Sequence, residues 1–399
     1  MPRCFTDAKA LMADLLDRHE AGAASPIGYP DYPEFVDVVA MDSFTKELRE
    51  AESAGGIRIV HGRGRNREQI AHVTLVEASA LYVLLGRRPI DNIVREASDR
   101  LLNDLDLPLA LQSSVQSIQS AWGRGKSWQG FFSSDANRLR VAFVMAKAIL
   151  EERHRGIDYR TFSRRIAGDS KALEKLEGPV VRLLSATLEF PPKARPRDAL
   201  RTLGLEKFAP PMLLSGQVDF GVAKLSAAAP LYFGIPPNEA SRLAFREKPQ
   251  YFLTIENFAS FNRHVIEADP QRRGVTVYVG GYPSLATQEG LRSLASAIPT
   301  DVPFFHWSDI DPDGAWIFRT IERAAGRPLK PHLMSGDIAE KFGKVPTEII
   351  RPALAPETSE IFELTKYLQR DDAKWLEQEE LDPIVPSTFP YEECRRDSG

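Results

Sequence analysis

Cysteine is scarce in this chain: only Cys4 and Cys394 occur in 399 residues, and they lie at opposite ends. That spacing excludes the usual zinc sites and disulfide frameworks. Long apolar runs are missing as well, since none approaches the roughly 18 residues that a membrane span requires. The start also lacks the pattern of a signal peptide. We therefore expect a protein of the reducing cytoplasm that has no contact with a membrane.

Charge of one sign is not in large excess, because the formal net charge is only −4. An overall basic field that attracts nucleic acid is thereby excluded, and any DNA binding must come from local basic patches. The length exceeds what one hydrophobic core normally serves, so two or three domains are expected.

Acidic residues follow two apolar stretches that have the pattern of buried strands. Asp309 and Asp311 come directly after the stretch 304–307, and Glu256 follows the stretch 251–255. Because α/β folds place their chemistry at the carboxyl ends of strands, these three carboxylates are expected at one edge of a sheet. Like charges so close repel one another unless a cation lies among them. Mg²⁺, which prefers hard oxygen ligands, is the natural occupant.

Two other roles for this acidic segment can be weighed by counting residues. An EF-hand calcium loop that begins at Asp309 needs a glutamate at its twelfth position, which is Thr320, so a calcium loop is excluded. A helix is expected over about residues 314–325, and Asp313 directly precedes it. We predict that Asp313 caps this helix, because a capping side chain must lie at the helix start.

The order of these motifs resembles a known family. Glu256 at one strand end, the Gly280-Gly281 turn after the stretch 275–279, and Asp309 with Asp311 at a third strand end are similar to the Toprim fold of topoisomerases, primases and related nucleases. More narrowly, four motifs resemble the JetD family, the nuclease subunits of Wadjet-type anti-plasmid systems and relatives of the topoisomerase VI A subunit. These are Thr254-Ile-Glu-Asn257, Gly280-Gly281-Tyr282, the segment 306–311 with Gly314, and Gly168-Asp169-Ser170-Lys171. The resemblance covers roughly residues 155–395.

The resemblance implies an endonuclease that depends on Mg²⁺ or Mn²⁺ and cuts double-stranded plasmid DNA when an SMC–kleisin-type complex licenses it. Glu256, Asp309 and Asp311 would be the catalytic and metal-binding residues. Asp309 and Asp311 would be metal ligands, and Glu256 would be a general acid/base or a metal ligand. Metal-activated water would cleave the phosphodiester bond. A homodimer is expected, because cutting both strands needs two sites related by a two-fold axis. The implied fold is an α/β Toprim-like C-terminal domain, with a parallel sheet flanked by helices, preceded by mostly helical and winged-helix-like domains.

Further residues near this site have expected supporting roles. The resemblance extends to an acidic element near the end, where Glu379 would provide a second metal site or lie on a solvated helix face. Gly280 and Gly281 would let the backbone approach a phosphate. His306 is expected in the core or behind the metal ligands, because imidazole is an unusual ligand for a hard metal.

Two alternative functions remain open. Topoisomerase VI relatives break DNA with a tyrosine that precedes the Toprim domain, and Tyr159 is the tyrosine nearest such a position. Its surroundings do not reproduce the double-tyrosine pattern of those transesterases, so hydrolysis is the favoured mechanism. The other alternative is a non-catalytic DNA-binding defence subunit that keeps the Toprim fold.

Basic residues gather at two places ahead of the acidic motifs. The first is a predicted hairpin tip between strands 57–60 and 70–75, which follows helices predicted over 7–20 and 41–52, the latter capped by Asp42 or Ser43. The second lies around the Gly-Asp-Ser-Lys turn. Phosphate contacts are predicted for Arg63, Arg65 and Arg67 at the hairpin tip and for Arg160, Arg164, Arg165 and Lys171 near the turn.

The predicted domains follow from this pattern. They are a winged-helix-like module over 1–85, a helical region over 86–155, a second winged-helix-like DNA-gripping module with a linker over 156–240, and the Toprim catalytic domain over 241–399. The front module does not clearly match the JetD amino-terminal region, so its role is left open between DNA and protein contact.

Overall fold

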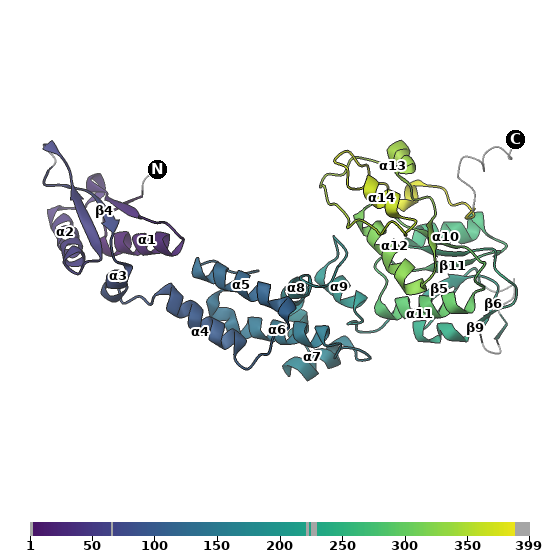
Figure 1. The fold of residues 1–399 in the computed structure, drawn as a ribbon. Helices are drawn as coiled ribbons and strands as arrows, with labels where there is room; N and C mark the ends of the chain where they lie inside the picture. Colours follow the sequence, from purple (N-terminus) through teal and green to yellow (C-terminus); the bar gives the residue numbers. More distant parts are fainter. Residues whose placement is uncertain (1–2, 65–66, 221–222, 225–229, 388–399) are drawn as a thin grey trace. The chain divides into compact units, whose positions relative to one another are not determined.

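The computed structural model describes residues 3–64, 67–220, 223–224 and 230–387. The chain divides into two compact units, Met1–Glu151 with Arg182–Thr187 and Glu152–Val181 with Leu188–Gly399 (Figure 1). None of the helices in the described ranges is long and apolar enough to cross a membrane.

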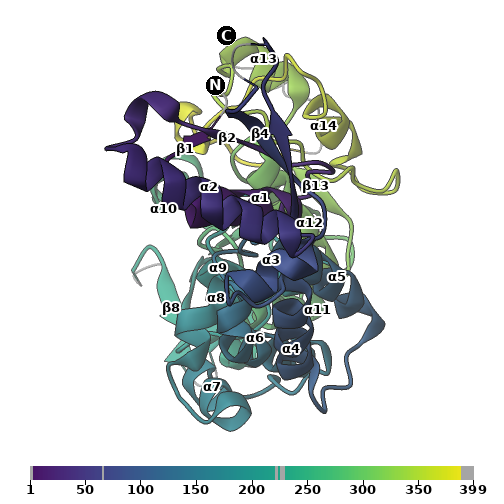
Figure 2. The ribbon, with the colours of Figure 1, turned by 90° about the vertical axis from the view of Figure 1, so that its left-hand side faces the viewer.

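The first unit begins with a small mixed sheet and three helices. The sheet has the order β1-β2-β4-β3, and its strands are Cys4–Phe5, Ile27–Pro30, Ile70–Leu75 and Ile57–His61 in that order. Helices α1 (Ala8–Glu20) and α2 (Val38–Ser53) pack against each other, as Figure 2 shows, and α3 (Ala78–Leu84) follows the sheet. Apolar residues at helical spacing, including Leu11, Leu15 and Leu48, are fully buried between these elements.

Helix α2 starts earlier than the sequence predicted. Asp37, rather than Asp42 or Ser43, is its cap, since the Asp37 carboxylate accepts a hydrogen bond of 2.7 Å from the Ala40 amide. The helix therefore begins at Val38, even though Val38 and Val39 are exposed. The two predicted strands of the hairpin are confirmed as β3 and β4, which pair antiparallel.

The remainder of the first unit is helical, as predicted. Helices α4 (Ile90–Leu102), α5 (Leu109–Gly123) and α6 (Ala136–Leu150) pack together, and α6 follows a short 3₁₀ turn at Ser133–Asp135. Trp122 is buried among them, and its indole N–H donates to the Phe131 carbonyl at 3.0 Å.

The second unit begins with three helices, α7 (Tyr159–Ala167), α8 (Ala172–Leu184) and α9 (Pro196–Thr202). Asp158 caps α7, and Gly168 ends it in the left-handed conformation with φ of 75°. The last residues of α8 are grouped with the first unit. Between α8 and α9 runs a proline-rich segment that contains Lys193.

A six-stranded sheet forms the centre of the second unit. Its order is β13-β12-β10-β11-β5-β8, and the strands are Leu329–Pro331, Phe304–Trp307, Phe252–Ile255, Val275–Tyr278, Met212–Ser215 and Phe233–Ile235. The first four are parallel to one another, whereas β5 pairs antiparallel with both of its neighbours, β11 and β8. The sheet is therefore mixed and not purely parallel as predicted, because β5 and β8, from residues before 241, extend it beyond β11. Strands β10 and β12 are buried along their whole length, as expected for strands covered on both faces.

Helices cover this sheet on both sides. Figure 1 shows α10 (Phe258–Arg263) on one side and α11 (Leu285–Ala297) on the other, and α11 packs against α12 (Pro312–Ala325). A π-helical turn, His264–Ala268, continues α10. The remaining elements are the small sheet β7-β6-β9 (Ala223–Lys224, Val218–Phe220, Leu243–Phe245), the 3₁₀ turns Pro237–Arg242 and η6 (Gln378–Glu380), and helices α13 (Gly336–Phe342) and α14 (Phe362–Tyr367).

Candidate active site

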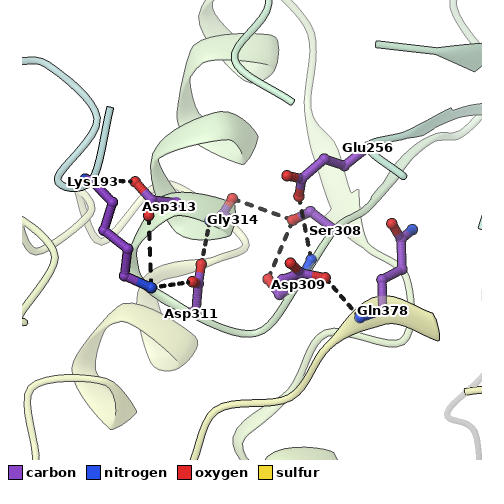
Figure 3. Close-up of polar contacts among 8 residues, drawn as sticks. All are labelled: Lys193, Glu256, Ser308, Asp309, Asp311, Asp313, Gly314 and Gln378. Atoms are coloured by element: carbon purple, nitrogen blue, oxygen red, sulfur yellow. Dashed lines mark hydrogen bonds and ion pairs between the residues drawn. The ribbon is translucent and has the colours of Figure 1, made fainter. Parts of the chain in front are cut away.

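Glu256 and Asp309 lie at the carboxyl ends of two adjacent parallel strands. Glu256 follows β10 directly, and Asp309 lies two residues beyond the end of β12. The chain leaves β10 for β11 on one side and later returns to β12 on the other, so the ends of β10 and β12 lie at a topological switch point. The Asp309 amide lies 3.4 Å from Glu256 Oε2 and donates to it (Figure 3). The predicted meeting of these two carboxylates at one sheet edge is present.

Both carboxyl groups hold their protons unusually tightly. Burial, followed by the charges of Asp309 and Asp311, raises the pKa of Glu256 to about 8. Burial, followed by the charges of Glu377 and Asp311, raises the pKa of Asp309 to about 7, although a hydrogen bond from the Gln378 amide opposes this shift. Near neutral pH, therefore, this pair shares protons unless a cation compensates its charge.

Asp311, and not Asp313, caps helix α12. Its Oδ1 accepts a hydrogen bond of 2.8 Å from the Gly314 amide, and Pro312 occupies the first helical position. Proline is favoured there because its fixed φ suits a helix and its missing N–H is not needed, so the cap is the residue before Pro312, two residues earlier than predicted. The predicted cap at Asp313 is therefore wrong, and Asp313 lies inside the first turn with its pKa raised by burial.

Gly314 lets the start of α12 pack closely on the site. A Cβ at this position would lie 2.0 Å from the Asp309 carbonyl oxygen, so no other residue fits without moving the backbone. The Ser308 hydroxyl is 3.4 Å from that same carbonyl and 3.3 Å from the Gly314 carbonyl. These contacts fix the turn that carries Asp309.

Lys193 is a member of this site that the sequence analysis missed. Its Nζ lies 3.0 Å from Asp311 Oδ2 and 3.9 Å from Asp313 Oδ2, and its backbone amide donates to Asp313 Oδ1 at 3.2 Å (Figure 3). The ammonium also lies 4.1 Å from the centre of the Trp375 ring. Lys193 precedes Asp311 by 118 residues and belongs to no motif, so no local signal could have found it.

Gln378 is a second residue of the site that was missed, although its segment was noticed for its acids. It is buried and joins the two strand ends: Oε1 accepts from the Asn257 amide at 2.9 Å and Nε2 donates to the Trp307 carbonyl at 3.0 Å. Its backbone amide donates to Asp309 Oδ1 at 2.7 Å. Gln378 thereby fixes the distance between β10 and β12 and orients Asp309.

Glu379 points to the same edge of the sheet but is held by a neighbour. The Asn257 side-chain amide donates to Glu379 Oε1 at 2.6 Å, and the charge of Glu379 contributes to the raised pKa of Asp309. A role for Glu379 as a metal ligand stays a prediction.

The supporting residues lie around the site. Gly280 and Gly281 have φ of 69° and 71°, a left-handed conformation that glycine adopts without strain, and they form the turn after β11. His306 is fully buried, with Nδ1 2.8 Å from the Thr254 hydroxyl and its ring against Phe318 of α12. Burial lowers the pKa of His306 to about 3, so the ring is a neutral core residue.

The oxygen donors of these side chains fit a hard divalent metal, but the side chains are not arranged as a metal site. Half-buried carboxylates that repel one another, such as Glu256 and Asp309, are the groups that Mg²⁺ or Mn²⁺ would stabilise as anions. Within the described ranges, however, no three or more His, Cys, Asp or Glu side chains are grouped so that they could hold a metal ion. Asp311 is engaged with Lys193 and the Gly314 amide.

The predicted DNA-contacting residues are exposed where they are described. Arg160, Arg164 and Arg165 lie on α7, and Lys171 follows the Gly168 turn; Arg63 and Arg67 are exposed at the hairpin of the first unit. Arg65 lies outside the described residues. DNA contact by these side chains stays a prediction.

Tyr159 has the environment of a structural residue. Its side chain is buried, its hydroxyl donates to Glu177, and the Arg197 guanidinium lies 5.4 Å from its ring centre. Burial, with the hydrogen bond to Glu177, raises the pKa of Tyr159, which is the reverse of what a nucleophilic phenol requires.

Comparison with known proteins places the carboxylate site in a matched region. Residues 223–387 match the family described as Wadjet protein JetD, C-terminal. The curated Wadjet protein JetD of Bacillus cereus (strain Q1) is 24% identical over 266 residues, which are 62% of this chain and 62% of that protein. The chain thus matches less than two thirds of the relative's length. Glu256, Asp309, Asp311 and Gln378 fall within residues 223–387, whereas Lys193 does not. The predicted resemblance to JetD is therefore confirmed, and it is carried by residues 223–387.

Proposed function

We propose that this protein is a divalent-metal-dependent DNA endonuclease of a Wadjet-type defence system. The observation that carries the proposal is the pair Glu256 and Asp309, half-buried at adjacent parallel strand ends inside the region that matches JetD. Such a pair at a switch point is suited to holding a cation beside a phosphate. A Toprim-like fold for residues 241–399 is part of the proposal.

Glu256, Asp309 and Asp311 would hold Mg²⁺ or Mn²⁺. When bound, such an ion neutralises charge on the phosphate oxygens and lowers the pKa of a water molecule. If Glu256 does not ligate the ion, its pKa, raised to about 8 in the metal-free protein, suits it to hold and transfer a proton near neutral pH. Gln378 and Ser308 keep Asp309 oriented, and the Gly280-Gly281 turn leaves room for the backbone of a substrate beside β11.

The substrate and partners follow from the same proposal. Double-stranded plasmid DNA would contact the exposed basic residues of α7 and the following turn, since guanidinium groups pair well with phosphates. A homodimer would present two sites to the two strands. An SMC–kleisin-type complex would license cleavage and so protect the host chromosome.

Hydrolysis is favoured over a covalent tyrosine mechanism because Tyr159 is buried and bonded to Glu177. The test is incubation of the purified protein with supercoiled plasmid and Mg²⁺ or Mn²⁺, with and without the SMC partners. We expect metal-dependent linear product, with no protein bound covalently to DNA ends in the wild type or in Tyr159→Phe. Absence of metal-dependent cleavage under both conditions would overturn the proposal, and a covalent adduct that Tyr159→Phe abolishes would replace hydrolysis by transesterification.

A further inference from the structure

A short strap, residues 189–193, lies along helix α12 and reaches the carboxylates at its start. At one end Glu189 forms an ion pair of 3.2 Å with Arg319, two turns into the helix. At the other end, the Lys193 amide and ammonium contact Asp313 and Asp311. Pro191 and Pro192 lie between these contacts and restrict the backbone of the strap.

The Lys193 ammonium occupies the place of a counter-ion. It lies near one oxygen of Asp311 and one of Asp313, while the other oxygen of each accepts from a backbone amide, Gly314 for Asp311 and Lys193 itself for Asp313. The Trp375 ring, on which the ammonium rests, is held by paired backbone hydrogen bonds of 2.8 and 2.9 Å to Lys344. Three contacts, two from the start of α12 and one from Trp375, therefore converge on one positive charge.

Asp311 Oδ2 cannot bind a metal while it is paired with the Lys193 ammonium, because two cations at one carboxylate oxygen repel each other. The side chain of Lys193 is 39% exposed, so it can swing into solvent without unfolding the strap. Buried side chains of the site, such as Gln378, cannot move into solvent in this way.

We propose that Lys193 is a built-in counter-ion that competes with the divalent metal for Asp311 and must leave before Asp311 becomes a ligand. The inference rests on the proposed function, since it assumes a metal at these carboxylates. Lys193 is a positioning residue in this scheme: it holds Asp311 and Asp313 in the metal-free protein and sets how much metal the site requires. By linkage, whatever displaces Lys193 tightens metal binding, and metal binding releases Lys193.

The test is the affinity of the full-length protein for Mn²⁺, measured by calorimetry and by the loss of free Mn²⁺ signal in electron paramagnetic resonance. Lys193→Met removes the charge and keeps the length, and it should bind Mn²⁺ about tenfold more tightly than wild type, within the usual range of coupling between sites. Lys193→Arg keeps a cation. Lys207→Met removes one charge from an exposed position elsewhere in the same unit. Both controls should stay within about twofold of wild type.

Equal or weaker Mn²⁺ binding by Lys193→Met would overturn the inference and leave the proposed function intact. Absence of Mn²⁺ binding in every variant, the wild type included, would overturn both. A thermal melt gives a readout that needs no activity: in EDTA, Lys193→Met should melt below wild type, because Asp311 and Asp313 lose their counter-ion, and saturating Mn²⁺ should raise its melting temperature more than that of wild type. A variant that melts identically to wild type in both conditions contradicts the role of counter-ion.

The strap offers an independent variant. Glu189→Gln removes the ion pair with Arg319 but leaves Lys193 in place. If the strap holds Lys193 on Asp311, Glu189→Gln should also tighten Mn²⁺ binding, by a smaller factor than Lys193→Met. If Glu189→Gln leaves Mn²⁺ affinity unchanged while Lys193→Met raises it, the effect belongs to Lys193 alone. That result would overturn the role assigned to the strap.

Discussion

The acidic site has two halves, Glu256 with Asp309 and Asp311 with Asp313. In each half the repulsion between neighbouring carboxylates is reduced in a different way. Glu256 and Asp309 are surrounded by neutral donors, the amides of Asp309 and Gln378, and their pKa values are raised to about 8 and about 7. Asp311 and Asp313 instead face the ammonium of Lys193 and the first turn of α12 (Figure 3). Protons relieve the repulsion between Glu256 and Asp309, whereas a fixed cation lies beside Asp311 and Asp313, although burial also raises the pKa of Asp313.

This difference determines what each half must give up when a divalent ion binds. The half with Glu256 and Asp309 must release protons, so its affinity for metal should rise with pH up to about 8. The half with Asp311 must release Lys193, an exchange of one cation for another. Variants of the two pairs should therefore have different effects.

The largest expected effect is on cleavage. Glu256→Gln and Asp309→Asn keep the shape of each side chain but remove a carboxylate, and each should lower the rate of plasmid cleavage by on the order of 10²–10⁴-fold. Asp313→Asn is the matched variant from the other half, and it should cost less than about tenfold, because Asp313 is engaged with the strap rather than with the strand ends. Initial rates of linear product, at saturating Mg²⁺ with the licensing partners, measure all three. Equal losses in the three variants would erase the distinction between the halves.

Gln378→Ala should be the most destabilising change near the Glu256 half. It leaves the buried Asn257 amide and Trp307 carbonyl without their partner, which should cost on the order of 2 kcal/mol of unfolding free energy. Urea denaturation without metal measures this loss. Glu380→Ala, two residues further on, removes only an exposed ion pair with Lys344 and should cost less than about 1 kcal/mol. Comparable losses in both variants would mean that Gln378 does not join the two strands.

The acids at the strand ends could be predicted from the sequence because parallel strands bring their carboxyl ends to one edge. The predicted stretches 251–255, 275–279 and 304–307 correspond to β10, β11 and β12, and Glu256 and Asp309 lie where that logic places them. The predicted helix cap was wrong, because Pro312 occupies the first position of α12 and the cap is therefore Asp311 and not Asp313. The sequence pattern also did not predict that the short strands β5 and β8 extend the sheet through antiparallel pairing.

Contacts between distant segments could not be predicted at all. Lys193 reaches Asp311 across 118 residues, and Gln378 reaches Asn257 across 121. A lysine beside two prolines and a glutamine between two glutamates have no pattern that names their partners. Periodicity and motif spacing report which face of a strand or helix a residue occupies, whereas these two side chains depend on how loops cross the finished sheet.

The stability of the metal-free protein should depend on pH through Glu256. Its pKa is about 8 in the folded chain and near 4.5 when unfolded, so the folded state binds more protons between these values. Stability therefore falls as pH rises from about 5 to about 8, by on the order of 1–3 kcal/mol. Glu256→Gln cannot titrate and should lose less over this range. Urea denaturation in EDTA at several pH values gives the difference between the two proteins, and a difference that does not change with pH would contradict the raised pKa.

The smallest effect is expected for Glu379→Gln. This variant tests whether Glu379 is a metal ligand together with Glu256 and Asp309. The amide keeps an oxygen that can accept from the Asn257 side chain, so the tail should stay in place and unfolding should change by less than about 1 kcal/mol. Removing its charge relieves part of the repulsion on Asp309, whose pKa should fall slightly. If Glu379 acts only through this field, cleavage at saturating Mg²⁺ should change less than about threefold, and Glu377→Gln, the matched neighbour that also raises the pKa of Asp309, should behave alike. A loss as large as that of Asp309→Asn, confined to Glu379→Gln, would instead make Glu379 a ligand and extend the metal-binding half to the tail.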